Sequence, residues 1–200
     1  MKQPNPAVPT VSRETADKLD KLAELILAWN RTINLISKND EQHIVDRHIV
    51  DSLALLPYLP SGFIRAIDLG SGAGFPGLVL AIATGSPFDL IEADQRKAAF
   101  LREAARLTQA PVRIHAIRIE ASTITPAPLV TARALAPLKT LLAWATPLLA
   151  PGGFALFPKG RNAEQELTDA RAQWHMHVEQ WPNPLDPSAR ILRLSEITRG

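Results

Sequence analysis

Apolar side chains recur at helical spacing along the first third of the chain. Positions 19, 22, 23, 26 and 27 are apolar and follow Ser12, a candidate N-cap, so the pattern predicts an amphipathic helix over residues 13–29. Asn39 and Gln42 resemble a capping box, and an apolar stripe from Ile44 to Leu56 predicts a second helix after them. The Pro-rich residues 1–11 show no periodicity and predict a mobile tail.

From residue 64 onward, short apolar strands alternate with helices. Strands are predicted at residues 64–69, 88–93, 112–117, 129–134 and 154–158, and helices at 76–84, 95–108, 137–148 and 162–173. Such alternation is typical of right-handed βαβ units and a parallel sheet with helices on both faces. Two further strands, at 175–180 and 189–197, are separated only by a Pro-rich loop and predict an antiparallel hairpin. We therefore expect a Rossmann-like α/β fold whose seven-stranded sheet is parallel except for this C-terminal hairpin.

Length and composition agree with this division of the chain. A chain of 200 residues, of which 46% are hydrophobic and 21% charged, can hold one α/β domain with a modest appendage. We expect a tail at residues 1–11, a helical extension at 12–60 and the sheet domain at 61–200. Residues 12–200 should form a single compact unit.

The composition also excludes several classes of protein and site. The chain has no cysteine, which excludes disulfides, thiolate metal sites and a cysteine nucleophile. No apolar run approaches the roughly 18 residues of a membrane-spanning helix, and the N-terminus lacks the apolar core of a signal peptide. We therefore expect a soluble cytoplasmic protein with no membrane partner. His175 and His177 share a face of one predicted strand, but without a third ligand they predict no metal site.

The positive charge is concentrated in the middle of the sequence, although the net charge is only +2. Between residues 95 and 161, ten basic residues stand against two acids, Glu103 and Glu120. Such a concentration favours a polyanion as partner, and the alternative is a solvated surface balanced by acids from elsewhere in the chain. The ten are Arg96, Lys97, Arg102, Arg106, Arg113, Arg118, Arg133, Lys139, Lys159 and Arg161.

A glycine-rich segment follows the first predicted strand of the sheet. Gly70, Gly72, Gly74 and Gly77 come directly after this strand, and Pro76 stands where the next helix begins. Glycine allows a sharp turn and lets a ligand lie against the backbone, and proline suits the first turn of a helix. The segment predicts a nucleotide-like ligand, but NAD and FAD folds share this glycine pattern.

Acidic neighbours of this segment favour S-adenosylmethionine over a dinucleotide. Asp68 places a carboxylate at the strand tip, where it would attract the methionine ammonium group and repel a pyrophosphate. Glu92 ends the next strand, 22 residues after Gly70, and can accept both ribose hydroxyls. Ile119 and Glu120 follow the third strand, where their backbone can contact the adenine edge.

Several segments together resemble one family. Residues 29–35 read WNRTINL, residues 47–53 read RHIVDSL and residues 68–77 read DLGSGAGFPG, with shorter matches at 100–101, 118–120, 132–134 and 159–160. Over about residues 25–160 the chain resembles the glucose-inhibited division protein B family, bacterial methyltransferases that act on guanine N7 of small-subunit ribosomal RNA. The FPG, RHI and DSL segments distinguish this family from other proteins with a glycine-rich loop more sharply than the glycines alone do.

The resemblance implies an activity, a cofactor and a set of contacts. It implies methyl transfer from S-adenosylmethionine to N7 of guanine 527 (ribosomal RNA numbering), in free 16S ribosomal RNA or in a precursor of the small subunit. Family members often have Asp where this chain has Glu92, so the ribose acid is longer by one methylene. A large RNA substrate and the lack of a spare apolar patch lead us to expect a monomer. The implied cofactor contacts are Gly70, Phe75, Ile119, Glu120 and Arg133.

Guanine N7 methylation suits both what the chain contains and what it lacks. N7 has a free lone pair, so an enzyme needs to align the reactants and not to remove a proton. The chain has no Asn-Pro-Pro-Tyr-like motif for an exocyclic amine and no cysteine for attack on a pyrimidine. Arg133, at the end of the fourth strand, is the candidate to orient the cofactor or substrate through a carboxylate or phosphate. A methyltransferase of another nucleic acid or of a small molecule, and a non-catalytic RNA-binding module, remain alternatives.

The candidate RNA contacts include residues that admit a second interpretation. His48, Asp51 and Ser52 have the composition of a hydrolase triad, but they lie in one helix without a nucleophile elbow. His48 can equally be a packed structural histidine, and Arg47 can pair with Asp51 one helical turn later. Lys159 ends the fifth strand, where a phosphate contact is favoured over catalysis. The full set of candidates is Arg47, His48, Arg96, Lys97, Lys159 and Arg161.

Overall fold

The computed structural model describes residues 8–200, so the greater part of the predicted tail lies outside the described residues. The strands are β1 (Ala66–Leu69), β2 (Phe88–Ile91), β3 (Val112–His115), β4 (Ala127–Ala132), β5 (Leu149–Lys159), β6 (Trp174–Pro182) and β7 (Arg190–Arg199). The α-helices are α1 (Arg13–Asn30), α2 (Asp51–Leu53), α3 (Gly77–Thr84), α4 (Gln95–Thr108), α5 (Leu138–Ala145) and α6 (Ala163–Arg171). Short helices of other types are η1 (Lys38–His43), η2 (Val45–Val50), η3 (Leu56–Tyr58), η4 (Ile119–Ala121) and η5 (Thr146–Leu148).

The seven strands form one sheet in the order β3-β2-β1-β4-β5-β7-β6. β1 pairs in parallel with β2 and β4, and the parallel pairing continues outward to β3 and β5. β7 pairs antiparallel with both β5 and β6. The expected Rossmann-like α/β fold, with a mostly parallel seven-stranded sheet and an antiparallel C-terminal hairpin, is confirmed.

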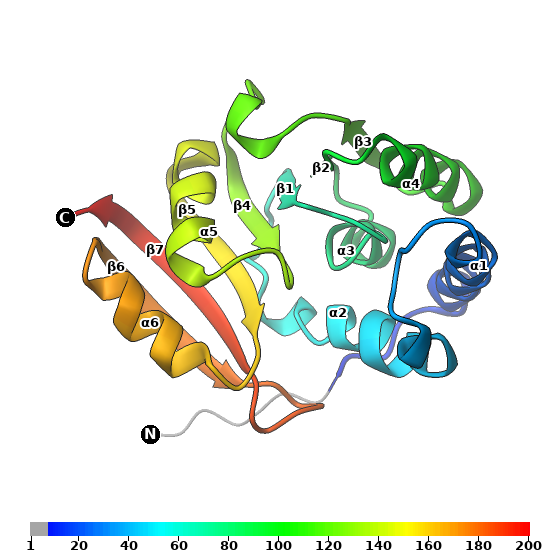
Figure 1. The fold of residues 1–200 in the computed structure, drawn as a ribbon, viewed down its shortest axis with the longest axis horizontal. Coiled ribbons are helices and arrows are strands. Elements are labelled where there is room, and N and C mark those ends of the chain that lie inside the picture. The colour runs from blue at the N-terminus through cyan, green and yellow to red at the C-terminus, as the bar shows by residue number, and fades with distance from the viewer. Residues whose placement is uncertain (1–7) are drawn as a thin grey trace.

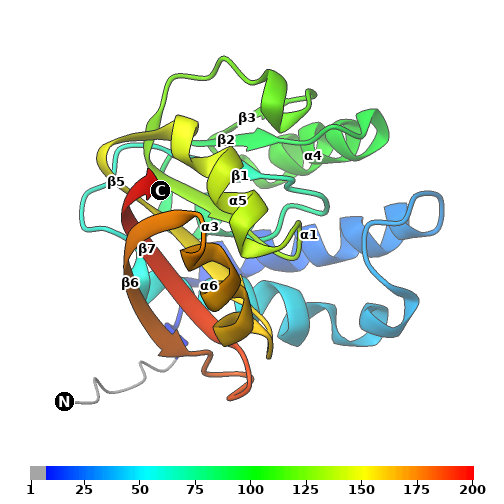
Figure 2. The same cartoon turned by 60° about the vertical axis from the view of Figure 1, so that its left-hand side comes forward.

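Helices cover both faces of the sheet. The helices α1, α3 and α4 lie on one side of it and α5 and α6 on the other (Figure 1), and Figure 2 brings α5 and α6 forward. Side chains of consecutive strand residues point to opposite faces. Ala66 and Leu90 therefore join the apolar cluster under α1, α3 and α4, whereas Ile67 and Ile91 join the cluster under α5 and α6.

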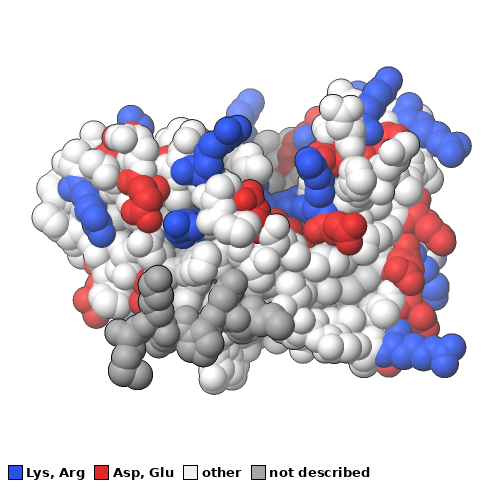
Figure 3. All heavy atoms as spheres, turned by 90° about the horizontal axis from the view of Figure 1, so that it is seen from below, with Lys and Arg blue, Asp and Glu red and all other residues white. Residues whose placement is uncertain are grey.

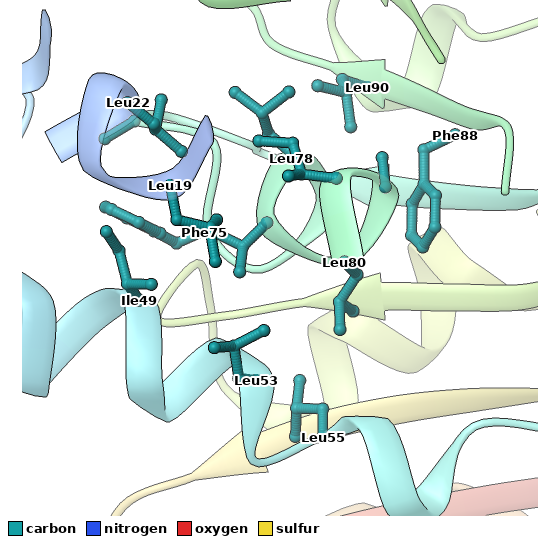
Figure 4. Close-up of a cluster of buried hydrophobic side chains, with 14 of the residues drawn as sticks. Leu19, Leu22, Ile49, Leu53, Leu55, Phe75, Leu78, Leu80, Phe88 and Leu90 are labelled. Carbon is teal, nitrogen blue, oxygen red and sulfur yellow. The ribbon is translucent and has the colours of Figure 1, made fainter. Parts of the chain in front are cut away.

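The N-terminal extension packs against α3 and α4. The Ser12 hydroxyl accepts the backbone N–H of Thr15 and so caps α1, as the sequence predicts. Leu19 of α1 and Ile49 of η2 lie beside Phe75 in the core (Figure 4). The extension and the sheet domain therefore share one hydrophobic cluster, and the extension covers the segment that carries the glycines.

The prediction of one continuous second helix is wrong. Between residues 38 and 58 the chain forms 3-10 turns, a π-helical turn (η2) and the three-residue α-helix α2. No side chain caps the start of η1, which follows Ser37, so Asn39 and Gln42 do not form a capping box. A π-helical turn is wider than an α-helical one and is common at functional sites. Here it carries Arg47 and His48.

Some strand boundaries also differ from the prediction. The prediction placed Ile64 in the first strand because this residue is apolar. In the structure Ile64 is 80% exposed, and β1 begins at Ala66. β4 ends at Ala132, and the left-handed φ of +51° at Ala134 turns the chain away from the sheet. Arg133 therefore lies just beyond the strand, at the edge where the carboxyl ends of the parallel strands meet.

We expect Leu22→Ala to destabilise the whole protein by about 2–5 kcal/mol, because Leu22 of α1 is fully buried in the shared cluster. Leu107→Ala on α4 is the control, since Leu107 is exposed and its loss should change stability by less than about 1 kcal/mol. Urea denaturation followed by circular dichroism measures both. A separate early transition for the N-terminal helices would contradict a shared core.

Candidate functional site

Three glycines give the loop after β1 its shape. Gly70, Gly72 and Gly74 have φ values of +60°, +53° and +94°, which other residues rarely adopt. A Cβ on Gly70 would lie 2.5 Å from Leu135 Cδ1, and a Cβ on Gly74 would lie 2.9 Å from Leu78 Cβ. The loop therefore needs glycine for both its conformation and its close packing.

Glu92 ties this loop to the end of β2. Its Oε2 atom accepts the backbone N–H of Gly72 (2.8 Å), and its Oε1 atom accepts the backbone N–H of Asp94 (2.8 Å). Each carboxylate oxygen has two lone pairs, so each can still accept one hydroxyl hydrogen. The side chain is almost fully buried and lines a cavity at this edge of the sheet. Its position is compatible with the ribose contact that the sequence suggests.

Asp68 lies outside the cavity, contrary to the direct ligand contact expected from the sequence. It is fully buried, and its Oδ1 atom accepts the Thr131 hydroxyl (2.6 Å). Its Oδ2 atom has no hydrogen-bond partner among residues 8–200 and faces Gly77, where a Cβ would lie 2.7 Å away. Burial raises the pKa of Asp68 to about 6. The carboxylate packs between β1, β4 and the start of α3.

A cavity of about 510 Å³ opens where the carboxyl ends of β1, β2 and β4 meet. This is the place where ligands bind in open α/β sheets, and the volume is typical of a site for a small molecule. The predicted contacts Gly70, Gly72, Phe75, Glu92, Ile119, Glu120 and Arg133 all line it, whereas Gly74 and Asp68 do not. His48 and Lys97, expected to contact RNA, line it as well.

The sequence did not indicate other residues that line the cavity. Leu35 and Ile36 come from the loop after α1, and Trp144 comes from α5. The Asn30 side chain holds this loop, because its Oδ1 atom accepts the backbone N–H groups of Leu35 (2.8 Å) and Ile36 (3.0 Å). Asn30 therefore has a turn-stabilising role. The signal available in the sequence was that Leu35 and Ile36 are two adjacent apolar residues after a turn.

Arg133 is the centre of a group of polar contacts at the cavity. Its Nη1 atom donates to Asp51 Oδ2 (3.0 Å) and to the Arg47 carbonyl (3.2 Å), and its Nη2 atom donates to His48 Nδ1 (2.7 Å). The guanidinium lies 4.9 Å from the centre of the Phe75 ring. The N-terminal extension thus holds the cation that follows β4. The alternative that Arg47 pairs with Asp51 is not realised, since Arg47 pairs with Asp40 and Asp51 with Arg133.

These contacts determine the protonation of His48. Arginine can only donate, so Nδ1 must be the acceptor and His48 is neutral, with its hydrogen on Nε2. Burial and the nearby Arg133 cation lower the pKa of His48, which agrees with a neutral ring. Its ring stacks on Phe75 with centroids 5.0 Å apart. Ser52 donates to the His48 carbonyl, so a hydrolase triad is not formed.

The candidate RNA contacts fall into two groups. Arg47, Arg96 and Arg161 are exposed, and Lys97 is half-buried between the cavity that Glu92 lines and a smaller one that includes Asn34. Lys159 is different, and the expectation of a phosphate contact there is wrong. Its ammonium group is buried, pairs with Glu166 (2.6 Å) and donates to the Ala136 carbonyl.

The basic residues of the middle segment do not form one cluster in space. Arg106 pairs with Glu103 on α4, and Arg113 lines another cavity, next to Arg65, at the amino ends of the strands. On the face drawn in Figure 3, Lys and Arg lie among Asp and Glu and do not form a continuous basic area. Neighbours in sequence are separated here because they belong to different elements, Arg106 to α4 and Arg113 to β3.

Two further features concern metals and membranes. Within residues 8–200, no three His, Cys, Asp or Glu side chains lie close enough together to hold a metal ion. None of the helices in that range is long and apolar enough to cross a bilayer.

Solved structures share the fold of this chain. One is titled a TehB-like SAM-dependent methyltransferase from Corynebacterium glutamicum, with a TM-score of 0.56 and 16% identity, covering 93% of this chain and 98% of that chain. Another is an MtNAS mutant in complex with S-adenosylmethionine, with a TM-score of 0.59 and 13% identity, covering 91% and 71%. At such identities the likeness concerns the fold alone. The fold places the chain in the Rossmann-like class of α/β proteins, to which these methyltransferases also belong.

Sequence comparisons identify the family within this class. Proteins named Ribosomal RNA small subunit methyltransferase G are 58% identical in Granulibacter bethesdensis, over 97% of this chain and 91% of that protein, and 53% identical in Gluconobacter oxydans, over 95% and 98%. The GidB family model, described as rRNA small subunit methyltransferase G, matches residues 15–184. The chain belongs to this family, which confirms the resemblance found in the sequence.

We expect Gly77→Ala to cost about 1–3 kcal/mol of stability, because the new methyl group would overlap the buried Asp68 side chain. Gly160→Ala is the matched control, since a Cβ there would have no neighbour within 4 Å. Thermal unfolding of both variants measures the difference. Equal melting temperatures for the two variants would contradict the packing of Gly77 on Asp68.

We expect Asp68→Asn to remove a pH dependence of stability. The folded wild-type protein keeps the Asp68 proton up to about pH 6, whereas an unfolded Asp releases it near pH ~3.9. The folded state therefore binds more protons in this range, and this contribution to stability falls by about 1 kcal/mol from pH 5 to pH 7.5. Urea denaturation at both pH values compares wild type and variant. An identical pH dependence in the two proteins would contradict the raised pKa.

Proposed function

We propose that the chain transfers the methyl group of S-adenosylmethionine to N7 of a guanine in 16S ribosomal RNA, at position 527 in ribosomal RNA numbering. Family membership supports small-subunit ribosomal RNA as the substrate, and it supports a cytoplasmic location. The observation that carries the cofactor assignment is the cavity, because Glu92 lines it with one free lone pair on each carboxylate oxygen.

The proposed arrangement assigns a role to each part of the cavity. Glu92 accepts the ribose hydroxyls, and the segment at Ile119 and Glu120 borders the adenine. The turns at Gly70 and Gly72 let the methionine part lie against the backbone. Arg133 binds the methionine carboxylate through the N–H groups that Asp51 and His48 leave free, and so orients the cofactor.

The chemistry requires alignment and no proton transfer. S-adenosylmethionine supplies a methyl group on a positively charged sulfur, which leaves as a neutral thioether when the guanine N7 lone pair forms the new bond. The methylated base gains the positive charge. Arg133 is balanced by Asp51 and His48 is neutral, so the side of the cavity that faces the base adds little repulsion.

The RNA is proposed to contact cations that are exposed or half-buried. Arg47, Arg96, Lys97 and Arg161 keep this role, and Lys159 does not, because its ammonium group is buried as well as paired with Glu166. We also propose that the protein is a monomer. The large exposed apolar side chains of residues 8–200 are few and lie in four separate segments of the chain: Val45 in η2, Ile64 before β1, Leu107 in α4 and Leu185 between β6 and β7.

The test of the proposed function is methyl transfer from tritiated S-adenosylmethionine. Purified protein is incubated with small subunits, and separately with free 16S RNA, from a strain that lacks the activity. We expect label in N7-methylguanine at one position, mapped by nuclease digestion and mass spectrometry. If folded protein that binds S-adenosylhomocysteine leaves both RNA samples unlabelled, the proposed substrate is wrong.

We expect Glu92→Ala to weaken S-adenosylhomocysteine binding at least about tenfold, since hydrogen bonds to a charged group contribute about 1.5–3 kcal/mol each. Isothermal titration calorimetry measures the dissociation constant. Glu103→Ala is the control, because this exposed acid on α4 pairs with Arg106 outside the cavity. Unchanged binding by the Glu92 variant would refute the ribose assignment.

A further inference from the structure

A buried polar side chain of the C-terminal hairpin is in contact with the Arg133 cluster. Asn183 lies directly after β6, in the connection to β7, and is only 5% exposed. Its backbone N–H donates to the Ala189 carbonyl (3.1 Å), which closes the loop. The residue lies outside the cavity, in the part of the chain that the family resemblance leaves without a function.

The hydrogen bonds of Asn183 fix the orientation of its amide. Its Oδ1 atom accepts the backbone N–H of Leu185 (2.8 Å), so its Nδ2 group is the donor to Asp51 Oδ1 (2.7 Å). The other oxygen of Asp51 accepts from Arg133 (3.0 Å). A carboxylate held at both oxygens cannot rotate freely, so the loop determines where Asp51 presents its charge.

The chain of hydrogen bonds that starts at Asn183 continues from Asp51 to the cavity. Arg133 donates to His48 and lies over the Phe75 ring, and all three of these side chains line the cavity. Asp51 is the acid that pairs with Arg133 in the structure. If Asp51 turned away, the guanidinium would lose this hydrogen bond and its fixed position over Phe75. Small shifts of an orienting group can lower the rate of a reaction that depends on alignment.

We propose that Asn183 is a positioning residue for methyl transfer, which acts through Asp51 to hold Arg133 at the cofactor cavity. The inference rests on the proposed function and deepens it. It also gives the β6–β7 connection a role, since its turn is formed around the Asn183 side chain. Asn183 does not line the cavity, so its contribution is indirect.

Three single variants separate positioning from packing. Asn183→Ala removes the donor and should lower kcat/KM for RNA methylation about tenfold. Asn183→Asp keeps the shape, but it places two carboxylates 2.7 Å apart and should lose at least as much activity. Ser188→Ala, in the same loop, removes only hydroxyl contacts to Asp186 and should stay within about twofold of wild type. Full activity in Asn183→Asp would overturn the proposal, because only the shape is then needed.

A double-mutant cycle tests the path through Asp51. Once Asp51→Ala has removed the acceptor, adding Asn183→Ala should change kcat/KM by less than about twofold. Thermal unfolding of all variants confirms that folded protein is compared. Losses that multiply in the double variant would overturn the route through Asp51. Wild-type protein serves as the reference. If it binds S-adenosylhomocysteine but methylates no RNA, the proposed function fails. If wild type is active and the losses of the variants multiply, only the role of Asn183 is contradicted.

Discussion

The contact between Arg133 and the N-terminal extension is the constraint on which the site depends. Arg133 follows β4, whereas its acceptors Asp51, His48 and the Arg47 carbonyl belong to the segment before the sheet. The Arg133 side chain is only 15% exposed, and such a cation would be costly without these partners, so the cavity is complete only with the extension in place. The apolar packing of Ile49 against the same region supports this docking. The extension is therefore part of the site, not a separate addition to it.

The fold was largely predictable because apolar period and strand–helix alternation are strong signals. The mostly parallel seven-stranded sheet, the glycine loop after β1 and the C-terminal hairpin follow from them, whereas the strand order comes from the structure. The errors occur where local pattern and tertiary packing disagree. Ile64 is apolar but exposed, and the segment from Ile44 to Leu56 has an apolar stripe that is buried by a π-helical turn and short 3-10 turns. A stripe shows which face is buried and does not determine the type of helix.

The candidate site was predictable where side chains belong to the loops after strands. Glu92 and Arg133 line the cavity because parallel strands bring their carboxyl ends to one edge. Asp68 and Lys159 have the same type of position, yet both are turned inward, Asp68 toward Thr131 and Lys159 toward Glu166. The sequence shows that a residue lies near a strand end, but which side of the strand end it faces depends on packing. Contacts over long sequence distances, such as that of Asn183 with Asp51, leave no local signal.

A crystal structure with S-adenosylhomocysteine bound would test most directly the claim that this cavity, closed by the extension, is the cofactor site. We predict that both ribose hydroxyls lie within hydrogen-bond distance of the Glu92 carboxylate and that the methionine carboxylate meets Arg133. Asp51 and His48 would keep their contacts with Arg133. A ligand bound outside the cavity, or one whose ribose makes no contact with Glu92, would contradict the account.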